Sequence, residues 1–211
     1  MILDPQDPAS YRPSLFNAVV APRPIGWIST VDAAGVANLA PFSYFNGISA
    51  TPPMVLFACN APEDRAEKDT LANVRATGEF ATNLVTWDLR HAMNRSSAAL
   101  PPGVDEFAPA GLTKRPSVKI RAPQVAESPV SLECAVLRIV DFDPMHPGER
   151  RSSVVFGRVV SMRIEDEFLA ANGRFDTLRA APIARLGGFS YLTTRELFEM
   201  PRPEKNLTGS A

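Results

Sequence analysis

The sequence predicts a mainly β, β-rich α+β fold: an antiparallel barrel with a few peripheral helices. Twenty prolines are spread along the 211 residues, and proline fits neither helix interiors nor central strands, so we expect short elements joined by many turns. Several long segments show the alternation or continuous apolar character of strands, whereas only two segments have helical periodicity. Closing antiparallel strands into a barrel also removes exposed edges.

The composition indicates a single folded domain. Hydrophobic residues make up 45% of the chain and charged residues 21%, which is typical of a globular protein that can bury a core. No change in composition marks a boundary, so we expect one domain over residues 1–200. The polar, proline-containing segment 201–211 is expected to be a frayed, flexible tail.

The charge and the termini exclude several classes of protein. The net charge is −1, so no basic excess is available to neutralise nucleic acid. The N-terminus lacks the features of a signal peptide, and no apolar run approaches the ~20 residues that cross a bilayer. We therefore expect a cytoplasmic protein with no membrane or nucleic-acid partner. Cys59 and Cys134 lie in apolar runs and are expected to be buried free thiols, and nothing indicates a metal site.

The first strands follow from alternation and turn signals. Segment 24–31 places Ile25, Trp27 and Val31 on one face, and the turn DAAG joins it to 36–40 as a hairpin. Segment 53–59 is continuously apolar and is predicted to be buried on both faces. A further strand is expected over 79–85.

Two longer strands are expected in the second half of the chain. Segment 131–142 begins with alternation that points Leu132, Cys134 and Val136 in one direction. Segment 153–164 is predicted to turn one set of side chains to the same side, namely Val154, Phe156, Val160, Met162 and Ile164.

Two helices are expected. Segment 68–78 has Asp69 or Thr70 as the predicted N-cap and Gly78 as the stop signal. Segment 87–97 is predicted to be an amphipathic surface helix, with an apolar face of Leu89, Ala92 and Met93 and a polar face of His91, Asn94 and Arg95.

Segment 38–53 fits neither a helix nor a strand and is the first candidate binding segment. It combines aromatic side chains with small hydrogen-bonding residues. This mixture suits a flat ring system with a polar edge, such as the isoalloxazine of a flavin, and an irregular backbone would offer free N–H and C=O groups to that edge. The alternative is a loop that lines the core and satisfies its own backbone.

A second candidate is the sequence Lys68–Asp69–Thr70. Helix N-termini bind phosphate through unpaired N–H groups, and Lys68 adds a charge while Thr70 adds a hydroxyl. The alternative is a plain helix cap beside a solvated lysine.

The C-terminal segment 182–192 and the histidines supply weaker candidates. Arg185 would neutralise negative charge and Tyr191 would stack on a ring, although an exposed turn explains both equally well. His91 is expected to be solvated on its helix. His146 lies in a turn-rich loop and is a candidate proton donor.

Taken together, the sequence resembles the flavin reductase-like family with an FMN-binding split barrel, which includes flavoredoxins and short flavin reductases. The resemblance covers roughly Arg23 to Thr194 and is specific in the order and spacing of its parts. It is carried by RPIGWIST (23–30), GVANLAPFSYFNGISATPPMV (35–55), KDTLANVRATGEFATNLV (68–85), VVFGRVVSMRI (154–164) and PIARLGGFSY (182–191).

The resemblance implies an antiparallel Greek-key split barrel that forms a homodimer and holds FMN, or alternatively FAD, near the subunit interface. It implies that Ser43, Tyr44, Phe45 and Asn46 lie along the isoalloxazine, and that Lys68, Asp69 and Thr70 lie near the ribityl-phosphate. It implies that Cys59, Asn60 and Asn83 are second-rank candidates for binding the flavin. It also implies that Arg185 and Tyr191 approach the flavin from the C-terminal side of the chain.

The resemblance also implies a reaction, with one departure. NAD(P)H would reduce the flavin by hydride transfer to N5, but the Gly-Asp-His that short flavin reductases often carry before segment 154–164 is replaced here by GERRSS. His146 is the candidate substitute, and Phe45, Tyr191 and Arg185 are candidates for holding the nicotinamide nucleotide. The alternatives are an FMN-holding electron-transfer protein without its own NAD(P)H site, and a related split barrel that oxidises pyridoxamine phosphate or binds haem. A partner oxygenase or other electron acceptor is expected.

Overall fold

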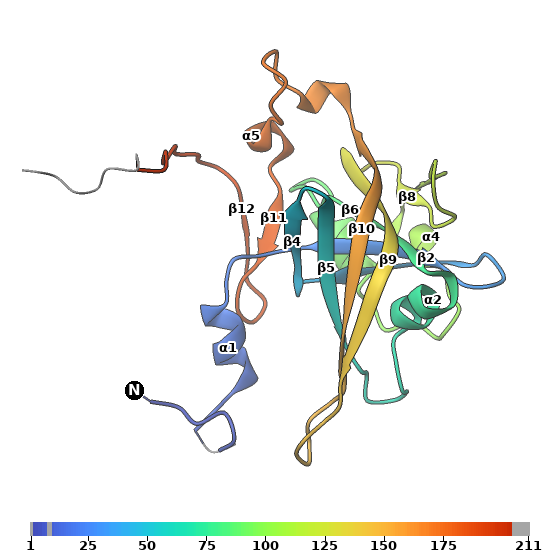
Figure 1. Cartoon of the computed structure of the whole chain (residues 1–211), viewed down its shortest axis with the longest axis vertical. Helices are drawn as coiled ribbons and strands as arrows, with labels where there is room; N and C mark the ends of the chain where they lie inside the picture. Colours follow the sequence, from blue (N-terminus) through green and yellow to red (C-terminus); the bar gives the residue numbers. More distant parts are fainter. Residues whose placement is uncertain (1, 8–9, 204–211) are drawn as a thin grey trace, which may run out of the picture.

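A seven-stranded antiparallel sheet forms the body of the computed structural model, which describes residues 2–7 and 10–203. In spatial order the sheet runs β3-β2-β6-β9-β10-β5-β4, and Figure 1 shows β4, β5, β10 and β9 side by side. The bounds are β2 Gly26–Val31, β3 Ala37–Phe42, β4 Phe45–Ala50, β5 Pro53–Asn60, β6 Glu79–Asn83, β9 Val130–Phe142 and β10 Ser152–Ile164.

Two small sheets and several short helices surround this body. The sheets are β1-β11-β12 (Arg23–Pro24, Ile183–Arg185, Tyr191–Thr193) and β7-β8 (Lys114–Arg115, Gln124–Val125). The helices are α1 Pro13–Val19, α2 Asp69–Thr77, α3 Arg90–Arg95, α4 Phe107–Ala110 and α5 Thr177–Ala180, with a 3₁₀ turn at Asp166–Phe168.

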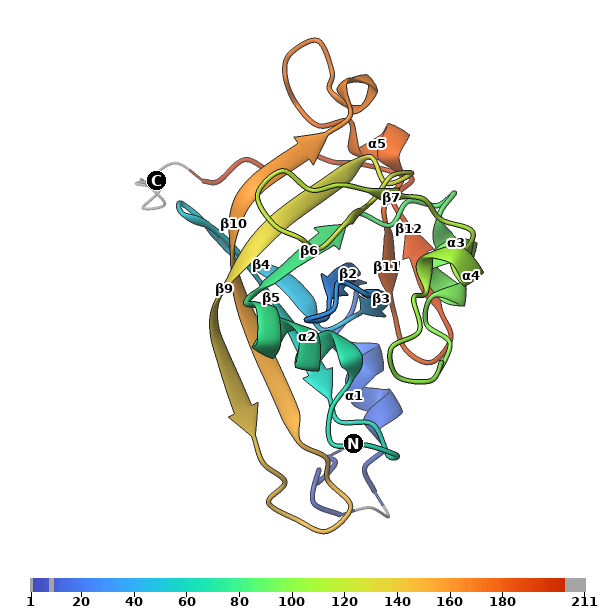
Figure 2. The same cartoon turned by 90° about the vertical axis from the view of Figure 1, so that its right-hand side faces the viewer.

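The strand order shows that the sheet curls into a barrel. β3 and β4 are the two edge strands, yet only Ser43 and Tyr44 separate them in the chain. The three steps from Phe42 to Phe45 span at most about 11 Å, so the two edges of the sheet must approach each other. The edges meet without pairing, which gives an open, split barrel (Figure 2). The predicted β-rich fold with peripheral helices is confirmed.

Two buried clusters form the core. One is centred on Trp27 and includes Ile25, Val31 and Met93, so the predicted inward face of 24–31 is confirmed. Trp27 also donates its indole N–H to Ser96 Oγ at 2.9 Å. The other cluster surrounds Phe57 and contains both cysteines, which are free and buried as predicted.

The prediction that segment 38–53 fits neither a helix nor a strand is wrong, because most of the segment is β-strand. It consists of β3, the short Ser43–Tyr44 connection and β4, followed by the turn into β5. Its proline, glycine and polar residues are accommodated because β3 and β4 are edge strands, which tolerate missing donors and bulges. A bulge occurs between Gly47 and Ser49.

The side of 153–164 that the sequence pattern groups together is the less buried side of β10. Val155 and Gly157 point into the core, whereas Val160 and Met162 are 40% and 55% exposed. Apolar residues occupy both sides of this strand, so alternation could not identify the buried side. Strand β5 is fully buried on one side only, through Val55, Phe57 and Cys59, and its other side is partly exposed in the single chain.

The helix predictions hold with one correction. α2 ends at Gly78, which adopts φ 71°, but its N-cap is Lys68 rather than Asp69 or Thr70. α3 is shorter than predicted and buries Ala92 and Met93 while His91, Asn94 and Arg95 are exposed. No helix among the described residues is long and apolar enough to cross a membrane. Of the expected tail, residues 204–211 lie outside the described residues and 201–203 are exposed without regular structure.

Candidate functional site

A cavity of about 440 Å³ lies between the start of α2 and the segment 96–102. Its floor is formed by β3 residues, its first wall by residues 62–70, and its second wall by 96–102 together with Glu106. Ligand sites in proteins typically measure roughly 300–1,000 Å³, so a nucleotide-sized ligand fits here. The lining includes all three residues of the predicted phosphate segment, Lys68, Asp69 and Thr70.

The first wall presents cationic groups and an uncapped helix end. No side chain caps the first N–H groups of α2, so these donors are available to an anion. Lys68 is the N-cap residue, and its Nζ lies 5.3 Å from the centroid of the Phe42 ring. Arg65 lines the same wall, and its terminal nitrogen lies 3.8 Å from Asp69 Oδ1.

The Nε–H of Arg65 is buried and has no hydrogen-bond partner among the described residues. A buried donor without an acceptor carries a desolvation penalty of roughly 1–3 kcal/mol. An anionic oxygen from a bound phosphate would remove this penalty. This arrangement therefore fits the phosphate of a nucleotide cofactor such as FMN.

The floor is held by a buried hydrogen-bond network. Asn38 Nδ2 donates to both carboxylate oxygens of Glu106 at 2.9 Å, and the N–H of Leu39 donates to Glu106 Oε2 at 2.7 Å. Thr70 Oγ1 donates to Asn38 Oδ1 at 2.7 Å. The hydroxyl proton of Thr70 is therefore engaged by Asn38, although the sequence had suggested it as a phosphate donor.

Glu106 is a carboxylate in a mostly buried position. Burial raises its pKa, while the hydrogen bonds from Leu39 and Asn38 act in the opposite direction. Because the carboxylate accepts N–H groups from β3, it ties the second wall to the floor. The network continues through Thr30, whose hydroxyl accepts from Asn73 Nδ2 at 3.0 Å.

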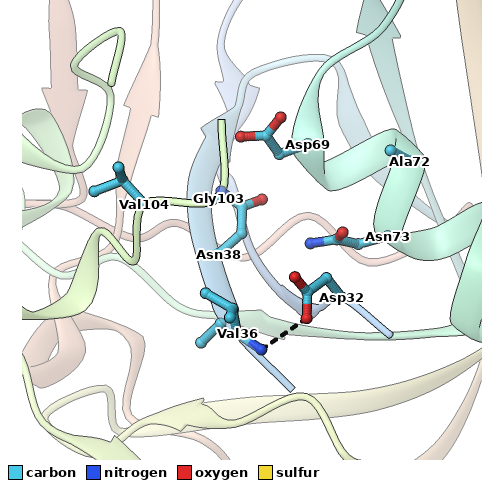
Figure 3. A pocket seen from close by; sticks show the side chains of 9 residues that line it. Asp32, Val36, Asn38, Asp69, Ala72, Asn73, Gly103 and Val104 are labelled. Carbon is cyan, nitrogen blue, oxygen red and sulfur yellow. Dashed lines mark hydrogen bonds between the residues drawn. The ribbon is translucent and has the colours of Figure 1, made fainter. Parts of the chain in front are cut away.

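A smaller cavity of about 100 Å³ adjoins the first one, and the two share Asn38 and Asp69 in their linings. Figure 3 shows Asp69, Asn73 and Asp32 around this space, with Asp32 accepting the N–H of Val36 at 2.8 Å. No group of three or more metal-ligating side chains occurs among the residues that the structure describes.

The predicted isoalloxazine residues lie at the closure of the barrel. Ser43 and Tyr44 connect β3 to β4, directly after the β3 floor residues Ala40 and Pro41. The Tyr44 hydroxyl donates to Asn17 Oδ1 at 2.6 Å. Phe45 packs on Gly26, where a Cβ would overlap its ring, and Asn46 is exposed.

The second-ranked candidates divide between the core and the surface. Cys59 is buried in the Phe57 cluster, and burial raises its pKa to about 12. Asn60 is exposed at the end of β5. Asn83 is fully engaged inside the barrel, where it donates to Trp27 O and accepts from Val125 N and Ser131 Oγ, so it lies outside the cavity lining.

The structure does not bring Arg185, Tyr191 or His146 into the cavity of their own chain. The Arg185 guanidinium lies 4.6 Å from the centroid of the Tyr191 ring and donates to its hydroxyl. His146 is exposed in the hairpin between β9 and β10, where its N–H donates to Glu149 Oε2 at 3.1 Å. Figure 2 shows this hairpin projecting from the barrel.

Sequence reasoning missed Arg65 and Glu106. Arg65 lies three residues before the Lys68–Asp69–Thr70 segment, and this proximity to a helix start was the available signal. Glu106 lies 68 residues from Asn38, so no local pattern connects them and only the tertiary fold does.

The chain is similar in sequence and fold to known proteins. The model of the family described as "Flavin reductase like domain" matches residues 20–179. An uncharacterized protein of Aquifex aeolicus is 37% identical over 178 residues, covering 84% of this chain and 87% of the relative. The uncharacterized protein BH2278 of Halalkalibacterium halodurans is also 37% identical, over 92% of this chain and 91% of its own length.

Solved structures show the same fold. Nitrilotriacetate monooxygenase component B from Bacillus cereus superimposes with a TM-score of 0.85 at 29% identity, over 95% of this chain and 99% of its own. The 2-nitrobenzoate 2-nitroreductase NbaA of Pseudomonas fluorescens gives a TM-score of 0.79 at 27% identity, over 93% and 92%. At 16% identity, flavoredoxin of Desulfovibrio vulgaris shares the fold, with a TM-score of 0.72 over 86% of this chain and 91% of its own.

Proposed function

Because the chain belongs to the flavin reductase-like family, we propose that it binds FMN in the 440 Å³ cavity and acts as an NAD(P)H-dependent flavin oxidoreductase. The observation that carries the proposal is the buried, unpartnered Nε–H of Arg65 beside Lys68 and the uncapped start of α2. These donors fit one terminal phosphate. FAD is the alternative flavin.

The residues of the chain bind and orient the flavin in this proposal. Arg65 and Lys68 hold the phosphate, and Asn38, fixed by Glu106, shapes the floor beside it. Ser43, Tyr44, Phe45 and Asn46 follow the floor toward the barrel closure and are proposed to flank the ring system. When bound, FMN supplies the hydride-accepting chemistry. No side chain has to act as a strong acid or base.

The electron donor is proposed to be NADH or NADPH, and the Bacillus cereus neighbour, a monooxygenase component by name, supports a partner oxygenase as the acceptor. His146 lies on an exposed hairpin, so it would assist reduction only across a subunit interface. His146→Ala is expected to slow flavin reduction while leaving FMN affinity unchanged. An unaltered rate in stopped-flow absorbance would exclude the residue.

The spectrum of the protein tests the flavin proposal. The purified protein, or apoprotein titrated with FMN, is expected to show a bound-flavin absorption spectrum with saturation in the micromolar range. Adding NADH or NADPH without oxygen is then expected to bleach the yellow colour. Absence of FMN and FAD binding would reject the proposal. Binding without bleaching would favour the alternative, an electron-transfer protein that receives electrons from another protein.

A further inference from the structure

A second cavity, of about 190 Å³, lies between α3 and the strands β11 and β12. It shares no lining residue with the proposed flavin cavity. Figure 2 shows α3 and β12 on one side of the barrel, with β9 and β10 on the other. The flavin proposal does not use this cavity, which is lined by Tyr191, a candidate stacking residue in the sequence, and by His91, which the sequence placed on a solvated helix face.

The base of the second cavity is apolar and buried. Met93 and Ile183 line it, and both are buried in the core cluster around Trp27. Leu192 lines the outer part and is 36% exposed. A ligand therefore meets a buried apolar floor and an open mouth.

Aromatic side chains with attached cations form the walls. The Arg90 guanidinium lies 3.9 Å from the centroid of the Trp87 ring, and Trp87 is 42% exposed. Tyr191 lines the cavity from β12, and the Arg185 guanidinium lies 4.6 Å from the centroid of its ring. The walls thus combine flat apolar faces with positive charge.

The charges at the mouth are unbalanced. Arg90 donates to the backbone oxygen of Trp87 at 2.6 Å, but no carboxylate of the described residues forms an ion pair with it. His91 and Asn94 also line the cavity, and no acidic residue does. The mouth therefore favours an anionic group and offers it charged and neutral donors.

The volume limits the ligand to one ring. An apolar cavity of about 150 Å³ is enough to bind benzene, so 190 Å³ holds a single six-membered ring with a small substituent. The three fused rings of a flavin are too large. We propose that this cavity binds a single-ring aromatic carboxylate, with the ring between Trp87 and Ile183 and the carboxylate at Arg90.

Benzoate and its neutral isostere benzamide test this inference. Isothermal titration of the FMN-saturated protein is expected to show saturable benzoate binding, with benzamide at least about tenfold weaker because it lacks the charge that pairs with Arg90. Arg90→Met keeps an apolar stem but removes the charge. It is expected to weaken benzoate binding about tenfold or more and to leave benzamide binding unchanged.

A second variant controls for folding and location. Leu192→Trp fills the open mouth of the cavity from a partly exposed position, and it is expected to abolish binding of both probes while FMN affinity and the melting temperature stay unchanged. The inference is overturned if benzoate shows no saturable binding at millimolar concentration, if Arg90→Met binds benzoate as the wild type does, or if FMN displaces benzoate. FMN binding is measured on the same samples, so failure of the flavin proposal is seen separately.

Discussion

Arg65 is the residue whose surroundings say most about the ligand of the first cavity. Its Nε–H is buried without a partner, while Glu106, the buried acid of the same cavity, has its oxygens occupied by N–H groups of Asn38 and Leu39. The carboxylate of Glu106 thus has its hydrogen bonds within the protein, whereas the Nε–H of Arg65 is available to a ligand. This asymmetry makes the site electropositive and suited to an anion.

Removing either cation is expected to weaken flavin binding. Because a hydrogen bond to a charged group contributes about 1.5–3 kcal/mol, Arg65→Ala and Lys68→Ala are each expected to reduce FMN affinity about tenfold to a hundredfold in fluorescence titration. The exposed residues Lys119 and Arg202 provide matched controls as Lys119→Ala and Arg202→Ala. Wild-type affinity in Arg65→Ala would remove that residue from the site.

The two thiols give a prediction about pH. Burial raises the pKa of Cys59 and of Cys134 from 9.0 to about 12. The unfolded chain therefore loses these protons first, and the stability that this provides is complete below pH 9 and lost as the pH rises toward 12. Urea unfolding from pH 7 to pH 11 is expected to show a decline that starts near pH 9. The double variant Cys59→Ala/Cys134→Ala is the control, and an equal decline in it would assign the effect to other groups.

At the scale of elements, the barrel depends on close contacts between neighbouring strands. β10 pairs with β5 and β9, and two register shifts interrupt its ladder with β9. Gly157 lies at the first of these shifts and faces the core beneath Phe80. Phe80 in turn packs against Phe57 in an edge-on arrangement with ring centroids 5.1 Å apart. A bulge at a glycine thus lets the longest strands bend around the aromatic core.

Adding a methyl group at this bulge is expected to destabilise the protein. In Gly157→Ala the new Cβ would overlap the Phe80 ring and approach Cys134 Cβ at 3.2 Å, and overpacking of this kind costs about 1–3 kcal/mol. Gly47→Ala on edge strand β4 is the matched control, because nothing lies within 4 Å of the added Cβ. Chemical denaturation measures both variants. Equal stability of the two would show that the core rearranges around residue 157.

At the scale of the whole molecule, the exposed apolar side chains indicate an incomplete assembly. Ile48 on β4, Leu137 on β9 and Met162 on β10 are 43%, 52% and 55% exposed. They belong to strands that are close together in the sheet order. Large apolar side chains exposed on one sheet are typical of an interface between subunits, so we propose that these strands form the homodimer.

Charges on this surface are expected to dissociate the dimer. Light scattering should give a dimer for the wild type and a monomer for Met162→Glu and Leu137→Glu, because an unpaired buried charge strongly disfavours association. Val19→Glu, at a 78% exposed position on helix α1, should remain dimeric. A monomeric wild type would contradict the proposal, and dimeric variants would move the interface elsewhere.

The sequence by itself determined the class of fold, and it pointed to one segment that lines the first cavity. Prolines and alternation indicated short antiparallel strands, and Lys68, Asp69 and Thr70 do line the cavity. These features are local, since they depend on residues within a few positions of one another. For the same reason Gly78 was recognised as the end of α2.

Only the tertiary structure decided which residues share a site. Glu106 accepts a hydrogen bond from Asn38, which lies 68 residues away in the sequence. Trp87 and Tyr191 line the same cavity although they come from distant segments. The side chain of Asn83 makes all its hydrogen bonds inside the barrel and does not line the first cavity. The buried face of β10 could not be predicted because apolar side chains occur on both faces of the strand. One face packs into the core, and the other is partly exposed. Contacts between distant residues depend on how the sheet curls and closes, and no local pattern records that closure.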